Sequence, residues 1–152
     1  MQTHVVSRAF QIIAILTLSG CASSSTTYIA QHPPRDNEAT LYIIRDSVYP
    51  RGCAVDVVVD GQKAASVAGR SFVRFNVPAG QRRLDFVWPV LCTMPTMKGS
   101  LGVKAGETRY LVMSTKSEIT GMVVVVILSK QTIRISEVPP AQGERLIHQL
   151  TD

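Results

Sequence analysis

Few of the side chains that perform catalysis occur in this chain at a spacing that chemistry would use. A hydrolytic site needs a nucleophile, a base and a residue that orients the base. Serines are plentiful, but no Gly-x-Ser-x-Gly motif and no well-placed histidine accompany them. The three histidines, His4, His32 and His148, include no pair with metal-ligand spacing. We therefore expect no catalytic residue, no bound metal and no cofactor, and a protein that is not an enzyme.

Paired carboxylates offer the remaining route to hydrolysis. Asp56, Asp60 and Asp85 are the candidates for such a pair. Each of them also fits a solvent-facing position on a strand or in a turn, and we favour that interpretation.

Cysteine chemistry gives a much stronger signal near the amino terminus. Arg8 precedes an apolar stretch of about ten residues, 9–18, which is too short to cross a bilayer as a permanent helix. The small residues Ser19 and Gly20 follow, and then Cys21. Together with Leu18 this order resembles the bacterial lipobox, in which the thiol of the first mature residue receives a diacylglyceryl group.

The lipobox resemblance implies a destination as well as a modification. Residues 1–20 are expected to be a signal peptide cleaved between Gly20 and Cys21, which leaves Cys21 attached to membrane lipid. Ala22 stands where Asp would favour retention at the inner membrane, so we expect an outer-membrane anchor facing the periplasm. A plain signal peptide that contains a cysteine, or a short buried helix, is the alternative.

The segment after Cys21 is predicted to be a tether. Residues 21–38 are polar, rich in serine and threonine, and contain Pro33-Pro34, so they favour a flexible coil that stiffens at its end. The remaining residues, 39–152, are numerous enough to form one domain with its own core.

Two further cysteines, Cys53 and Cys92, would lie in an oxidising compartment after export. A bond between them would close a loop of about 40 residues. We predict this disulfide, and two free buried thiols are the alternative.

The domain is predicted to be all-β, because short alternating segments are separated by Gly and Pro at intervals of about 8–12 residues. An antiparallel β-sandwich of about eight strands, immunoglobulin-like or transthyretin-like, fits this spacing. Asp60-Gly61 predicts a tight hairpin, and residues 141–150 a short amphipathic helix. The expected strands are 40–46, 54–60, 62–67, 70–77, 82–88, 97–103, 107–115, 121–128 and 131–138, of which 121–128 is predicted to be buried on both sides.

The formal net charge of +5 raises the question of an anionic partner. Nucleic acid is a poor candidate outside the cytoplasm. Several basic residues fall on neighbouring predicted strands and could form a patch for a phosphate-bearing lipid or polymer. An ordinary solvated face is the alternative. The candidate patch consists of Lys63, Arg70, Arg74, Arg82 and Arg83.

The order of short motifs in this chain resembles the order found in a family of small bacterial lipoproteins that have a single all-β domain of unknown function. The motifs are residues 41–45, Val59-Asp60-Gly61, Val77-Pro78-Ala79-Gly80 and residues 104–110, and the match covers roughly residues 39–138. There is also a distant likeness to small cell-surface β-sandwich repeats whose Pro-Glu-Gly-Ala signature is missing here. The resemblance implies a sandwich and no established activity.

Two functions follow from these observations. The first is a membrane-anchored, non-catalytic interaction or structural module that docks on another envelope protein, with strand addition at a free sheet edge as one route. The second is a binding module for cell-wall glycan or an acidic envelope polymer through the basic residues.

Overall fold

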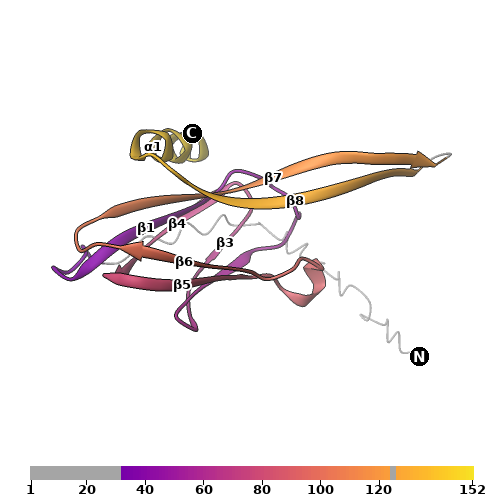
Figure 1. Ribbon diagram of the computed structural model, residues 1–152. Coiled ribbons are helices and arrows are strands. Elements are labelled where there is room, and N and C mark those ends of the chain that lie inside the picture. The colour runs from indigo at the N-terminus through magenta and orange to yellow at the C-terminus, as the bar shows by residue number, and fades with distance from the viewer. Residues whose placement is uncertain (1–31, 124–125) are drawn as a thin grey trace, which may run out of the picture.

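The structure is a computed structural model that describes residues 32–123 and 126–152, with the side chains of residues 117–131 outside the described set. The predicted signal peptide, its cleavage site at Gly20 and the predicted lipidation site Cys21 lie outside the described residues. Within the described residues, eight strands and one α-helix build the domain (Figure 1). Their order is β1 (Glu38–Arg45), β2 (Val55–Val59), β3 (Gln62–Val67), β4 (Ser71–Pro78), β5 (Gly80–Val87), the 3₁₀ turn η1 (Val90–Cys92), β6 (Met97–Val103), β7 (Thr108–Val123), β8 (Val126–Val138) and α1 (Pro140–Thr151).

The strands form two four-stranded sheets that pack face to face. One sheet has the order β4-β1-β7-β8 and the other the order β3-β2-β5-β6. The all-β sandwich predicted from the sequence is therefore confirmed. One pairing departs from the antiparallel rule, because β1 and β7 run parallel over Thr40–Arg45 and Thr108–Met113. β3, the strand predicted over residues 62–67, is an outer strand of its sheet.

The prediction of one strand over residues 121–128 is wrong. The end of β7 and the start of β8 share this run, and Val123 pairs with Val126. Eight apolar residues without Gly-Asn or Asp-Gly punctuation match a buried strand in length and composition, so the pattern concealed a hairpin. Beyond Met113 the rest of β7 pairs only with β8, and Figure 1 shows the two strands extending past the sandwich.

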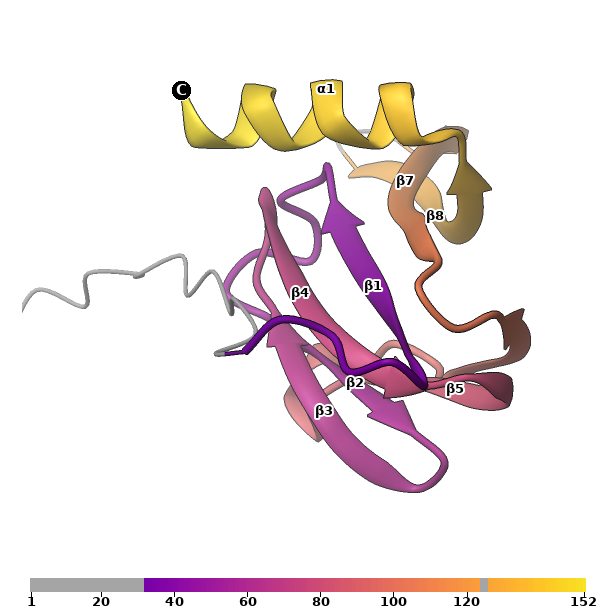
Figure 2. The same ribbon diagram turned by 90° about the vertical axis from the view of Figure 1, so that its left-hand side faces the viewer.

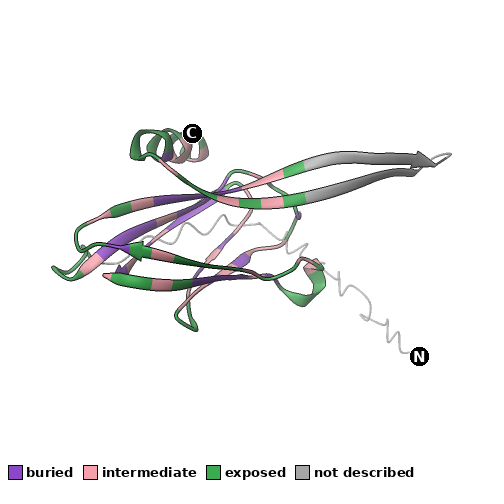
Figure 3. Cartoon of the chain, viewed as in Figure 1, coloured by how far each residue is buried: buried purple, intermediate pink, exposed green. Residues whose placement is uncertain are grey.

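The main core lies between the sheets. Alternate residues of each strand point inward, as in Leu41 and Ile43 of β1 and Leu84 and Phe86 of β5, and all four are buried. Figure 3 shows this burial concentrated along the middle of the strands.

A second, smaller core explains why β1 is apolar on both faces. The outward-facing Ile44, Phe72, Tyr110 and Val112 are buried beneath α1. Figure 2 shows the helix lying across the outer face of this sheet. The helix, predicted as amphipathic over residues 141–150, packs Leu146, Ile147 and Leu150 against this core.

The last residues of the predicted tether lie against the sandwich. Asn76 of β4 donates a side-chain hydrogen bond to the His32 carbonyl at 3.2 Å, and the Ala79 amide donates to the Asn37 carbonyl at 2.9 Å. Residues 32–37 thus run beside β4 before β1 begins.

Candidate functional site

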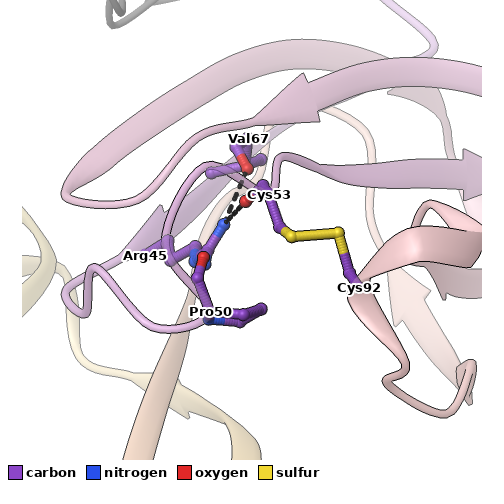
Figure 4. Close-up of a disulfide and its surroundings, with 5 residues drawn as sticks. All are labelled: Arg45, Pro50, Cys53, Val67 and Cys92. Atoms are coloured by element: carbon purple, nitrogen blue, oxygen red, sulfur yellow. Dashed lines mark hydrogen bonds between the residues drawn. A yellow bond between two sulfur atoms is a disulfide. The ribbon is translucent and has the colours of Figure 1, made fainter.

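Arg45 is the last residue of β1 and occupies an inward-facing position, in phase with Leu41 and Ile43. Its side chain is only 1% exposed. The guanidinium donates hydrogen bonds to the carbonyls of Cys53, Val67 (3.3 Å) and Pro50 (3.1 Å), as Figure 4 shows. Arg45 therefore ties the loop between β1 and β2, residues 46–54, to the end of β3.

The positive charge of Arg45 is stabilised by backbone carbonyl groups rather than by a carboxylate. Among the described residues no carboxylate forms an ion pair with it, and its guanidinium carbon lies 4.9 Å from the ring centre of Trp88. Burial lowers the pKa of Arg45 from its ordinary value, yet an arginine keeps its proton at any physiological pH. The contact also fixes Trp88, which is 5% exposed and belongs to the core.

Nothing in the sequence analysis singled out Arg45. The signal was present in the alternation of β1, because Arg45 shares the parity of Ala39, Leu41 and Ile43. This parity places Arg45 on the inward face, but only the fold brings the carbonyls of Cys53, Val67 and Pro50 within reach of its guanidinium.

The predicted disulfide between Cys53 and Cys92 is confirmed, with the two Cα atoms 6.2 Å apart. Cys53 precedes β2 and Cys92 follows β5. These two strands are antiparallel neighbours, so the start of one lies beside the end of the other. The bond joins the 46–54 loop to η1 and holds this end of the sandwich together (Figure 4).

Large apolar side chains are exposed at the same end. Val90 and Leu91 of η1, which we call the apolar tip, are 94% and 95% exposed. Val48 and Tyr49, in the disulfide-bridged loop, are 45% and 37% exposed. Figure 3 shows η1 at the surface, beyond the buried middle of the strands. A pair of adjacent aliphatic side chains this exposed marks a candidate contact surface.

The candidate basic residues are distributed over both sheets, and three of them have carboxylate partners. Lys63 lies 2.8 Å from Asp56, Arg82 lies 2.8 Å from Asp60, and Arg83 lies 3.2 Å from Asp85, between the charged atoms of each pair. Arg70 lies in the turn before β4, and Arg74 lies within β4 opposite Tyr42.

The three aspartates considered for catalysis each pair with a basic side chain rather than with one another. Asp60 is exposed and Asp56 is half-buried, but Asp85 is only 8% exposed, so the solvent-facing position predicted for Asp85 is wrong. Hydrogen bonds from Lys63 and Ser66 outweigh the effect of burial and lower the pKa of Asp56. The backbone amide of Arg83, with help from the Arg82 guanidinium, lowers the pKa of Asp60. Groups held in the ionised form by such partners suit structural pairs better than general acids.

Two further findings concern only residues 32–123 and 126–152. They contain no group of three or more His, Cys, Asp or Glu arranged to hold a metal ion. They also contain no helix that is both long and apolar enough to cross a membrane.

Comparisons with known proteins do not assign the chain to a family. No family model matches the chain, and no similar curated protein or solved structure was found. The candidate site is therefore defined by its own residues: the apolar tip, the disulfide and the buried Arg45.

Proposed function

We propose that this chain is a bacterial envelope lipoprotein, anchored through Cys21, whose β-sandwich acts as a non-catalytic interaction module. The observation that carries the proposal is the order Leu18-Ser19-Gly20-Cys21 after a short basic and apolar leader. The Cys53–Cys92 disulfide agrees with an exported domain, because such bonds persist in oxidising compartments. The expected location is the outer membrane, facing the periplasm.

The edge strands of the domain support a binding role. Each sheet has two edge strands, β4 and β8 in one and β3 and β6 in the other. Edge strands present backbone donors and acceptors to a partner segment. Another envelope protein that pairs with one of these edges, or that contacts the exposed loops, is the partner we expect.

The anchoring is tested by replacing Cys21 with alanine and fractionating cells of the natural host. The wild-type chain is expected in the outer-membrane fraction with acyl mass on Cys21, and Cys21→Ala should lose both the acyl mass and the membrane attachment. Ser23→Ala, two residues away, is the matched control and should behave as wild type. A Cys21→Ala chain that still fractionates with membranes, or a wild-type chain without acyl mass, contradicts the anchor.

The partner is tested by crosslinking in intact cells followed by mass spectrometry of the adducts. One dominant envelope protein supports the interaction module. Glycan adducts, or retention on purified cell wall that collapses with rising salt, support the second function instead. On the described part of the chain Arg70 and Arg74 form no ion pair, so they are the basic residues whose replacement by alanine should weaken such retention.

A further inference from the structure

The conformation of the apolar tip is fixed by a disulfide and by backbone hydrogen bonds. Cys92 is bonded to Cys53 and its amide donates to the Pro89 carbonyl at 2.8 Å. The Thr93 amide donates to the Val90 carbonyl, so the turn closes on itself. Trp88, just before the turn, is buried in the core. These constraints hold Val90 and Leu91 outward at almost full exposure.

The charges of the loops at this end of the sandwich favour an anionic surface. Arg51 in the bridged loop and Arg70 in the turn before β4 are exposed. The Arg70 amide donates to the Ser47 carbonyl at 3.2 Å, which joins that turn to the loop. Asp46 is the single carboxylate in residues 46–54, 68–70 and 88–96. Desolvation raises the pKa of Asp46, which disfavours its charged form.

We propose that the apolar tip inserts into the surface of an anionic lipid bilayer and so orients the sandwich on the membrane. The residue types match the layers of a bilayer. Val90 and Leu91 are aliphatic and fit the acyl region, Tyr49 is an aromatic residue with a polar end that fits the interface, and Arg51 and Arg70 fit the phosphate layer.

The backbone of the turn can also enter the interface at little cost, because the amides of Cys92 and Thr93 are already bonded within the turn. Two adjacent aliphatic side chains that project outward at 94% and 95% exposure fit a deformable lipid surface better than a rigid protein groove.

This inference deepens the proposed function and rests on it, because the lipid anchor at Cys21 is what keeps the domain near the membrane. As a coil, the tether predicted from the sequence would have a root-mean-square length of roughly 20 Å from Cys21 to His32, which would keep an anchored domain close to the headgroups. At the high effective concentration that such a tether provides, even a weak contact is populated.

The test places a tryptophan at the tip and asks whether lipid reaches it. The full chain is isolated from the host and mixed or reconstituted with vesicles of phosphatidylglycerol and phosphatidylcholine that carry bromine on their acyl chains. Leu91→Trp is compared with Ala105→Trp, an exposed residue in the turn before β7. The natural Trp88 is the only other tryptophan and is buried, so it supplies a common background.

We expect a blue shift and bromine quenching for Leu91→Trp and neither change for Ala105→Trp. Replacing both tip residues, as Val90→Ser with Leu91→Ser, should lower vesicle affinity of unanchored chain at least tenfold. Arg51→Ala with Arg70→Ala should reduce the preference for phosphatidylglycerol over phosphatidylcholine vesicles.

A Leu91→Trp side chain that stays in water on anionic vesicles overturns the proposal, whatever the acyl mass of Cys21. Quenching without acyl mass would support the tip while refuting the anchor, so the two failures are distinguishable. Burial of Leu91→Trp that grows with protein concentration in the absence of vesicles would assign the tip to a second copy of the chain and also overturn the proposal.

Discussion

At the scale of single residues, Arg45 has the largest structural consequence. It places a positive charge in the interior and satisfies three backbone carbonyls from three different positions, Cys53, Val67 and Pro50. A buried charge is costly unless its hydrogen bonds are made, and removing it leaves its partners unsatisfied. Arg45 is therefore a positioning residue for the loop that carries Tyr49 and Cys53.

Replacing Arg45 with alanine should lower the free energy of unfolding by about 3 kcal/mol, because buried carbonyls lose their donors and a cavity forms beside Trp88. Arg45→Lys should recover only part of this loss, since one ammonium group cannot reproduce the fork of a guanidinium. Urea denaturation checks both variants. Arg70→Ala, at an exposed arginine, is the control, and equal stabilities for the two alanine variants would refute this role of Arg45.

The disulfide acts at the same end of the molecule through the unfolded state. Its two cysteines are 39 residues apart in sequence, so the chain-entropy argument gives about 4 kcal/mol of stabilisation. Cys53→Ser combined with Cys92→Ser should lower the free energy of unfolding by that order, measured by urea denaturation. Reductant should destabilise the wild type to a similar extent and leave the double variant unchanged. If reductant had no effect on the wild type, the bond would contribute nothing to stability.

At the scale of elements, the packing of α1 on β7 depends on one glycine. Gly143 is the one residue of α1 that is buried. A Cβ atom there would overlap the ring of Tyr110 and lie 2.8 Å from its Cβ. Tyr110 cannot turn aside easily, because its ring stacks on Tyr42 at a centroid distance of 4.8 Å. The close approach of helix to sheet therefore requires the absence of a side chain at this position.

Gly143→Ala sets two effects against each other. Helix propensity alone would stabilise the domain by about 1 kcal/mol. Forcing a methyl group against Tyr110 costs about 1–3 kcal/mol. We expect the clash to dominate and the melting temperature to fall. Gln142→Ala, at the exposed neighbouring position, should leave it nearly unchanged. A higher melting temperature for Gly143→Ala would show that α1 can move away from β7 without loss.

The hairpin between β7 and β8 shows where element prediction failed. A turn between two strands is recognised in a sequence by polar or turn-forming residues that interrupt the apolar pattern. After Gly121, residues 121–128 contain no such residue, so the turn gave no signal. The pairing of Val123 with Val126 depends on the register that β7 and β8 take from residues nearer the sandwich, such as Tyr110 with Val138. Local sequence does not contain that register.

At the scale of the whole molecule, the ion pairs predict a sensitivity to acid. The pKa values of Asp56, Asp60 and Glu107 lie below the ordinary values of 3.8 for aspartate and 4.5 for glutamate. A carboxyl group whose folded pKa is depressed contributes stability above its unfolded pKa and loses it as the pH falls through the folded pKa. Asp46, whose pKa is raised, acts in the opposite sense and offsets part of this dependence.

We therefore expect the urea midpoint to be nearly constant around neutral pH and to fall as the pH drops below about 4.5. Asp60→Asn removes one contributor while an asparagine still tolerates the positive φ of 50° at this turn. Its urea midpoint should depend less steeply on acid pH than that of the wild type. A midpoint that rises on acidification would mean that Asp46 and other groups of raised pKa dominate.

The sequence by itself determined the strands outside residues 121–128, the Asp60-Gly61 hairpin, the amphipathic helix α1 and the pairing of Cys53 with Cys92. These depend on alternation, turn chemistry and redox compartment, which are local or compositional properties. The lipobox at Cys21 belongs to the same class and remains a prediction, because it lies outside the described residues.

Only the tertiary structure decided the parallel pairing of β1 with β7, the burial of Arg45 and the exposure of Val90 and Leu91. Each depends on which strand ends meet at one end of the sandwich, and that is a non-local property of the sheet order. Hydrophobicity alone places Val90 and Leu91 inside and Arg45 outside. The structure reverses both assignments. Arg45 donates hydrogen bonds to three carbonyls within the fold, and no described residue buries the apolar tip.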